Sequence, residues 1–298
     1  MKRSRLRFSS TIAALLAVPL LAMACSSEPS PTPTLPLVEA IPATVDLGVG
    51  ENRVSFLLIS YTELITASEA RVTPFFVPSK TEDPGETIVA PFHLWPFGTR
   101  GSYVADINFD QPGDWLLFIE FEDEQGQTRN TSLALDVAAS TVTPALGSKP
   151  PIVPTKTVRG TGPEGLTSWS TPDLELYQFS LEEVTRSGRP SVVAISSPAY
   201  CTSPTCGPQA EAVSELKDKF RNEGVFIHVE VYDNPEEIQG DLTRGTYSEL
   251  VDTWGLSSLE GYLNESWVFI LDRGGRVAFK YEGFASVEEM SKDLQTLL

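Results

Sequence analysis

A proline-rich stretch at residues 139–165 divides the chain into two regions with different hydrophobic patterns. It holds five prolines between Pro144 and Pro163 and shows no periodic apolar pattern. Because proline lacks a backbone N–H and clashes with helical geometry, such a stretch favours an extended linker. We therefore expect two separately packed domains, at residues 38–138 and 166–298, and no internal repeat joins them.

The first 24 residues have the character of a secretory signal peptide. Four Lys and Arg residues within the first seven positions precede an apolar run at residues 11–24. This run is shorter than the roughly 20 apolar residues that a membrane span needs. It ends in the sequence LAMAC at residues 21–25, which resembles a bacterial lipobox. Ala22 stands three residues before the cysteine, where the lipobox usually has leucine.

The lipobox resemblance implies that Cys25 carries a lipid and becomes the N-terminus of the mature chain. The protein would then be anchored to the cell membrane, facing outside the cytoplasm, with residues 25–37 as a Pro/Ser-rich tether. The alternative is a plain signal peptide cut near Ala24, with Cys25 as a free thiol. Lipidation of Cys25 leaves Cys201 and Cys206 as a pair, in a compartment where disulfides persist.

The charge balance narrows the classes of partner. The chain has 22 Lys and Arg against 40 Asp and Glu, a formal net charge of −18. So acidic a chain argues against a nucleic-acid partner, because little is available to neutralise phosphates. The lipid bilayer is expected as a partner only through Cys25. With 2 His and 3 Cys the chain has little material for a metal cage, and we expect neither a metal nor a cofactor.

Residues 38–138 predict an all-β domain. Short β-type runs without a helical period alternate with turn signals, at residues 54–59, 71–77, 101–107, 115–121 and 132–137. The segment at residues 101–123 resembles the late hairpin of immunoglobulin-like modules in secreted bacterial proteins, which implies an immunoglobulin-like β-sandwich. His93 lies among aromatic residues and prolines, and we expect a packed loop residue rather than a metal ligand.

Residues 166–298 alternate strands and helices. Strands are expected at residues 190–196 and 225–232, and a hairpin at 267–271 and 276–281 across the turn at 272–275. Helices are expected at residues 208–220, around 247–254, and toward the C-terminus, where Val287, Met290, Leu294 and Leu297 recur at helical spacing. The order β-α-β-α-β-β-α predicts an α/β fold.

Two cysteines lie between the first strand and the first helix of this order. Cys201 follows Tyr200, and Cys206 precedes the expected helix. This placement resembles the thioredoxin fold, as do the run Trp254-Gly255-Leu256 and the hairpin at residues 269–277. The resemblance covers residues 166–298 and implies that Cys201 attacks a substrate sulfur and Cys206 resolves the mixed disulfide. A helix N-terminus stabilises a thiolate, so such a nucleophile exists near neutral pH.

Three features depart from the thioredoxin pattern. Four residues separate Cys201 from Cys206, where the family usually has two. Ser266 stands where the family has a cis-proline, and we expect its peptide bond to be trans, because a non-proline cis bond costs about 3–4 kcal/mol. The strand before Cys201 lacks the family's buried carboxylate. His228, placed near the disulfide by the alignment, is a candidate proton relay, or else a half-buried histidine bonded to Glu230 or the backbone.

The leading hypothesis is an anchored thiol–disulfide oxidoreductase that acts on exported cysteine-containing proteins or a redox partner. One alternative is a binding or scaffold lipoprotein in which the bond between Cys201 and Cys206 is structural. Another is a Sco-type copper chaperone, because thiolates and imidazole suit copper. That family uses a histidine after a later hairpin, and this chain has no histidine after His228.

Overall fold

The computed structural model describes residues 37–79, 84–96, 98–259 and 265–298. The leader, Cys25 and all but the last residue of the expected tether lie outside these residues. Within the described ranges, none of the helices combines the length and the apolar character that a membrane crossing requires. The expected lipid anchor therefore stays a prediction.

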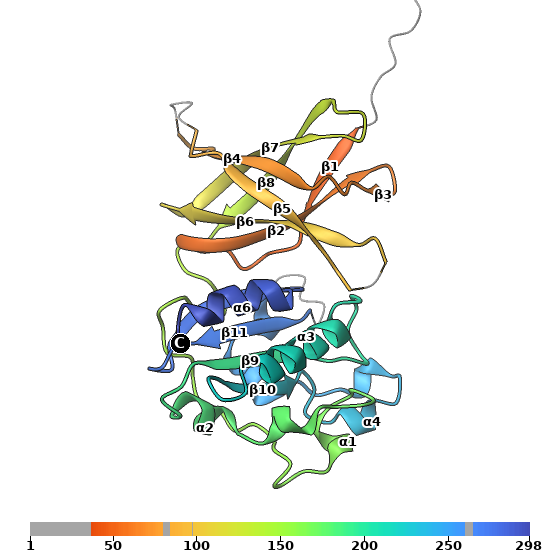
Figure 1. The fold of residues 1–298 in the computed structure, drawn as a ribbon, viewed down its shortest axis with the longest axis vertical. Coiled ribbons are helices and arrows are strands. Elements are labelled where there is room, and N and C mark those ends of the chain that lie inside the picture. The colour runs from red at the N-terminus through yellow and green to blue at the C-terminus, as the bar shows by residue number, and fades with distance from the viewer. Residues whose placement is uncertain (1–36, 80–83, 97, 260–264) are drawn as a thin grey trace, which may run out of the picture. The chain divides into compact units, whose positions relative to one another are not determined.

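The first described region is an antiparallel sheet (Figure 1). Its strands follow the order β1-β2-β6-β5-β4-β7-β8, and the short strand β3 pairs with β2. The strands are β1 (Val38–Pro42), β2 (Gly50–Ser60), β3 (Glu63–Leu64), β4 (Glu69–Phe76), β5 (Ile88–Leu94), β6 (Gly101–Phe109), β7 (Gly113–Glu122) and β8 (Thr128–Val137). The all-β prediction for this region is confirmed, whereas its likeness to immunoglobulin modules stays a prediction.

Alternating side chains build the core of this region. On β7, Trp115, Leu117, Ile119 and Phe121 are buried and their neighbours are more exposed. A period of two places these four side chains on one face of the strand. They pack in a single apolar cluster with side chains from the other strands.

Strand β5 was not expected from the sequence, because Pro91 lies inside it and proline donates no ladder hydrogen bond. After Pro91 the strand changes its pairing partner from β4 to β6. Ile88 to Pro91 lie opposite β4, and Phe92 to Leu94 lie opposite β6. His93 is half-buried on this strand opposite Ser102, so it is a strand residue rather than a loop residue.

The second described sheet has the order β10-β9-β11-β12. Strand β10 (Val225–Glu230) runs parallel to β9 (Ser191–Ser196), and β11 (Trp267–Leu271) is antiparallel to both β9 and β12 (Val277–Glu282). The helices are α1 (Pro163–Leu166), η1 (Leu174–Tyr177), α2 (Leu181–Thr185), α3 (Cys206–Lys219), α4 (Pro235–Ile238), η2 (Leu242–Arg244), α5 (Glu249–Thr253), η3 (Leu256–Ser258) and α6 (Val287–Gln295). The order β9-α3-β10-α5-β11-β12-α6 is the one expected from the sequence, and the other short helices were not expected.

Apolar side chains cover both faces of the second sheet. Val192 and Ala194 of β9 share one cluster with Leu216 of α3 and Leu294 of α6. Val193 lies in a second cluster, with side chains of α2 and α5. A strand buried on both faces must be apolar throughout, which explains the continuous run at residues 192–195.

The proline-rich stretch makes specific contacts with the second region. Val153 is buried in an apolar cluster, and the Trp254 indole donates to the Pro151 carbonyl at 2.9 Å. The domain boundaries expected from the sequence stay predictions.

Candidate functional site

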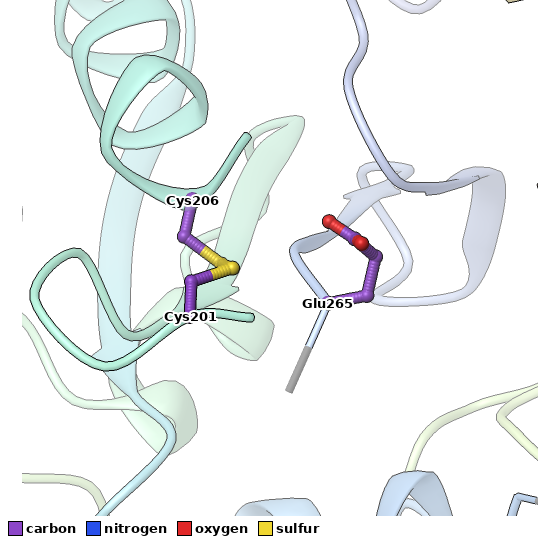
Figure 2. Close-up of side chains that lie close together, drawn as sticks. All are labelled: Cys201, Cys206 and Glu265. Carbon is purple, nitrogen blue, oxygen red and sulfur yellow. A yellow bond between two sulfur atoms is a disulfide. The ribbon is translucent and has the colours of Figure 1, made fainter. Parts of the chain in front are cut away.

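A disulfide lies at the start of helix α3. Cys206 is the first residue of α3, and Cys201 lies in the loop that follows β9. Their sulfur atoms are 2.04 Å apart and their Cα atoms 6.0 Å apart (Figure 2). The first turn of α3 has no acidic residue, and its last turn carries Lys217 and Lys219. Cys206 therefore lies at the positive end of the helix dipole, and the two lysines lie at its negative end.

The two cysteines differ in exposure. Cys206 is fully buried, whereas Cys201 is half-buried. Cys201 is therefore the more accessible of the two cysteines, and Cys206 lies buried at the helix N-terminus. The helix N-terminus stabilises the Cys206 thiolate, and a stabilised leaving thiolate speeds exchange. The disulfide thus joins a half-buried cysteine in the loop after β9 to a buried cysteine in the first turn of α3.

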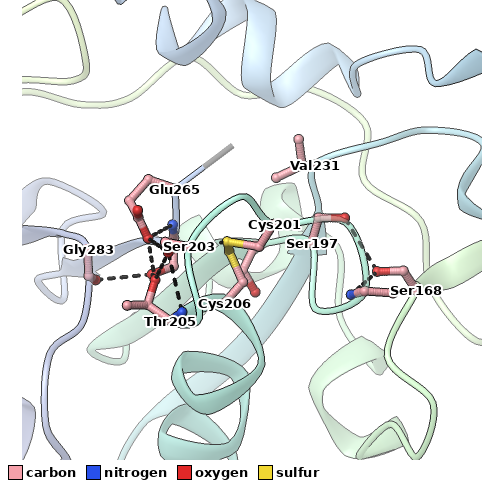
Figure 3. Close-up of a disulfide and its surroundings, with 12 residues drawn as sticks. Ser168, Ser197, Cys201, Ser203, Thr205, Cys206, Val231, Glu265 and Gly283 are labelled. Carbon is pink, nitrogen blue, oxygen red and sulfur yellow. Dashed lines mark hydrogen bonds between the residues drawn. A yellow bond between two sulfur atoms is a disulfide. The ribbon is translucent and has the colours of Figure 1, made fainter. Parts of the chain in front are cut away.

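Glu265 lies in front of the disulfide, just before strand β11. One of its carboxylate oxygens and the two sulfur atoms all lie within 4.8 Å of one another. Figure 2 shows the Glu265 side chain facing the disulfide. Its Oε1 accepts hydrogen bonds from the Ser203 hydroxyl at 2.6 Å and from the Thr205 hydroxyl. The Ser203 Oγ is also 3.6 Å from the Cys201 sulfur (Figure 3). The loop between the cysteines therefore orients this carboxylate beside the reactive bond.

Ser266, expected at the cis-proline position, is buried next to the same group. Its hydroxyl donates to the Gly283 carbonyl at 3.1 Å and lies 3.4 Å from the Thr205 hydroxyl. Its backbone N–H donates to Glu265 at 3.2 Å. Ser266 thus links the start of β11 to the start of α3.

A second carboxylate, Glu230, is buried at the end of strand β10. It accepts from the Ser168 backbone N–H at 2.7 Å and the Ser168 hydroxyl at 2.8 Å, and from Thr167 at 3.2 Å. Burial raises the pKa of Glu230 above its usual range, and the hydrogen bonds from the Ser168 backbone and from neighbouring hydroxyls oppose that rise. The Ser168 hydroxyl in turn accepts from the Ala199 N–H at 3.1 Å. Glu230 is therefore connected to the loop that carries Cys201.

His228 is buried on strand β10 between two hydroxyl groups. Its Nδ1 is 2.7 Å from the Tyr177 hydroxyl, and its Nε2 is 2.8 Å from the Ser196 hydroxyl. Burial lowers the pKa of His228 to about 3, which the bond to Ser196 opposes. The imidazole is therefore neutral at ordinary pH, with one nitrogen as donor and the other as acceptor. Its role as a proton relay stays a prediction.

The side chains that could hold a metal ion in the described part of the chain are Cys201, Cys206 and Glu265. Thiolates, rather than disulfide sulfurs, ligate metals. In the disulfide form the two cysteines therefore offer no thiolate ligand, and only reduction would supply them.

Sequence reasoning missed both carboxylates. Glu265 directly precedes Ser266, so the alignment that placed Ser266 beside the disulfide also placed Glu265 there. Glu230 lies opposite Ser196 in the register of β10 and β9. Parallel pairing thus brings it beside the end of the strand that leads to Cys201, and a strand register is not visible in one sequence.

Comparisons with known proteins show only a weak similarity between this chain and solved structures. No family model matches the chain. No curated protein matches it. Among solved structures it is similar to a thiol:disulfide interchange protein, a thioredoxin family protein from Chlorobium tepidum TLS, at TM-score 0.35 and 14% identity, over 51% of this chain and 97% of that one. It is also similar to murine CRIg, at TM-score 0.22 and 7% identity, over 35% of this chain and 96% of that one. At these scores neither likeness carries an argument, and what agrees with the sequence expectation is the strand order of the second region and the place of α3 after β9.

Proposed function

We propose that this chain is a membrane-anchored, extracytoplasmic protein that performs thiol–disulfide exchange through Cys201 and Cys206. The observation that carries the proposal is the disulfide at the start of α3, with an accessible Cys201 and a buried Cys206 at the helix N-terminus. A thiolate attacks Cys201 along the line of the disulfide, and Cys206 leaves as a thiolate. In the reverse direction, Cys201 attacks a substrate disulfide and Cys206 releases the product.

The anchor, the substrate class and the β-sheet region complete the proposal. Lipidated Cys25 holds the chain at the membrane, and the Pro/Ser-rich segment after it acts as a tether. The substrates are exported proteins with cysteines, or a redox partner. The first sheet is proposed as an immunoglobulin-like module that presents or positions the second region.

The reduction potential of the cysteine pair tests this function. Equilibrating the full chain with glutathione buffers and counting alkylated thiols by mass gives the potential. We expect a value between about −120 and −270 mV, the range of exchange proteins. A potential below about −300 mV would instead identify a structural bond in a binding or scaffold lipoprotein.

Single cysteine variants test the assigned roles. We expect Cys206→Ser to accumulate a mixed disulfide at Cys201 when it meets a disulfide substrate, because nothing resolves the intermediate. Cys201→Ser should trap far less, because Cys206 is buried. Equal trapping by the two variants, measured by non-reducing mass spectrometry, would contradict the roles.

A further inference from the structure

The carboxylate beside the disulfide has no counter-ion among the residues that the structure describes. None of the ion pairs in those ranges includes Glu265. The sequence also contains no Lys or Arg at residues 200–208 or 260–264. A negative charge within 4.8 Å of both sulfur atoms is thus left for a partner to compensate.

The position of this charge is fixed by neutral donors. Ser203, Thr205 and the Ser266 backbone N–H all donate to Oε1 of Glu265. Three donors on one oxygen suit a carboxylate, which only accepts when ionised. These donors orient the charge and do not cancel it. Glu265 itself is only half-buried, so a bound partner can approach it.

We propose that Glu265 makes this disulfide selective for partners that carry a positive charge beside their reacting cysteine. The inference rests on the thiol–disulfide exchange proposed above and names its substrate class. A protein substrate of this class has Lys or Arg next to the cysteine. The formal net charge of −18 favours the encounter with such cationic segments as well.

The step that Glu265 influences is the attack on Cys201. The thiolate of a first thiol forms a bond to the Cys201 sulfur, the bond between Cys201 and Cys206 breaks, and its electron pair leaves on Cys206. A second thiolate then attacks the sulfur of the first thiol and releases Cys201. The two thiols are oxidised to one disulfide, the protein disulfide is reduced to two thiols, and the two thiol protons end on Cys201 and Cys206.

Charge on the attacking thiol changes the barrier of this step. The transition state spreads negative charge over three sulfur atoms in front of the Glu265 carboxylate. A unit charge at roughly 6 Å from a carboxylate changes a rate by a factor of about 3 in bulk water, and by more at a lower effective dielectric. Replacing a carboxylate on the thiol by an ammonium changes two units of charge, so we expect an effect of about tenfold.

Three small thiols supply the test. Cysteamine carries an ammonium, 3-mercaptopropionate a carboxylate, and 2-mercaptoethanol no charge. The rate at which each reduces the full chain is measured by quenched alkylation and mass spectrometry. The readout is the cysteamine to 3-mercaptopropionate rate ratio, compared between the wild type and Glu265→Gln, because this comparison cancels the intrinsic reactivity of the thiols.

We expect the cysteamine to 3-mercaptopropionate rate ratio to fall about tenfold in Glu265→Gln. In Glu265→Lys, which reverses the charge, we expect this ratio to fall further. Glu215→Gln, an exposed residue further along α3, is the matched control and should keep the wild-type ratio. High salt should shrink the wild-type ratio, because accessible charges are screened.

Two outcomes overturn the inference in distinguishable ways. If all thiols reduce the wild type but the ratio is unchanged in both Glu265 variants, exchange stands and charge selectivity is wrong. If none of the three thiols reduces the folded wild type, the proposed exchange fails, and the selectivity fails with it.

Discussion

At the scale of single residues, the buried polar side chains of the second region have distinct roles. His228 is held by two neutral hydroxyls and kept uncharged by burial. Glu265 is held by neutral donors and left charged at the half-exposed front of the disulfide. Of these two side chains, only Glu265 is exposed enough for a partner to reach, whereas His228 is buried within the fold.

His228 makes stability depend on pH in a definite direction. Its pKa is about 3 in the folded protein and near 6.5 in the unfolded chain, so the unfolded chain binds more protons between these values. Stability is complete above pH 6.5 and falls as the pH drops through this window. Acidification from pH 7 to 5 should cost the wild type about 2 kcal/mol more than it costs His228→Leu.

Urea unfolding of both proteins at pH 7 and pH 5 measures this difference. The raised pKa of Glu230 makes the folded state more stable as the pH falls, opposite to the effect of His228. Because Glu230 is present in both proteins, the difference between them reports on His228. An equal loss in the two proteins would show that His228 takes up its proton in the folded state. Because Leu leaves the Tyr177 and Ser196 hydroxyls without their partner, His228→Leu should also be less stable at both pH values.

At the scale of elements, local signals placed most of the described strands and the helices α3, α5 and α6, whereas the other short helices were not expected. The hairpin of β11 and β12 turns at Gly275 with φ +73°, and the Asp272 side chain accepts from the Gly274 and Arg276 N–H groups. Helix α3 begins at Cys206, two residues before the expected start, so this cysteine lies within the first turn. Strand β5 was not predicted, because a proline inside a short segment argues locally against a strand. The two strands that pair with β5, β4 and β6, lie elsewhere in the chain and are not visible from this local pattern.

Two glycines in these elements should respond oppositely to alanine. At Gly275 a Cβ would lie 2.9 Å from the Thr185 carbonyl oxygen, at a positive φ that alanine disfavours. Gly275→Ala should therefore destabilise the protein by about 1–2 kcal/mol. Gly207 lies in α3 with no atom within 4 Å of a Cβ, and Gly207→Ala should stabilise by up to about 1 kcal/mol. Thermal or urea unfolding decides the signs, and two changes of the same sign would contradict this geometry.

At the scale of the whole molecule, the leader and the charge balance predict where the protein is located and which partners it favours. The N-terminal basic and apolar segments, followed by Cys25, predict a lipid anchor. A formal net charge of −18 gives a protein that repels acidic partners. Selectivity for cationic partners at Glu265 agrees with this balance.

The anchor is tested by Cys25→Ser in a bacterial host that processes lipoproteins. We expect the wild type in the membrane fraction with incorporated labelled fatty acid, and Cys25→Ser without label and released from the membrane. The double variant Cys201→Ser/Cys206→Ser is the control and should remain anchored. Equal membrane retention of Cys25→Ser would instead favour attachment by another route.

The sequence by itself determined the order of elements and the placement of the cysteine pair. Strand and helix periods, turn residues and prolines are local features, so the thioredoxin-like order could be predicted from one chain. The position of Cys201 and Cys206 between the first strand and the first helix followed from the same order.

Only the tertiary structure decided which groups surround the disulfide. Glu265, just before β11, lies beside the two sulfur atoms. Glu230, at the end of β10, is connected through Ser168 to the loop that carries Cys201. Sheet register and packing bring them close, and these depend on contacts between segments that no local pattern specifies. The same packing buries Cys206 at the start of α3 and leaves Cys201, in the loop after β9, half-buried.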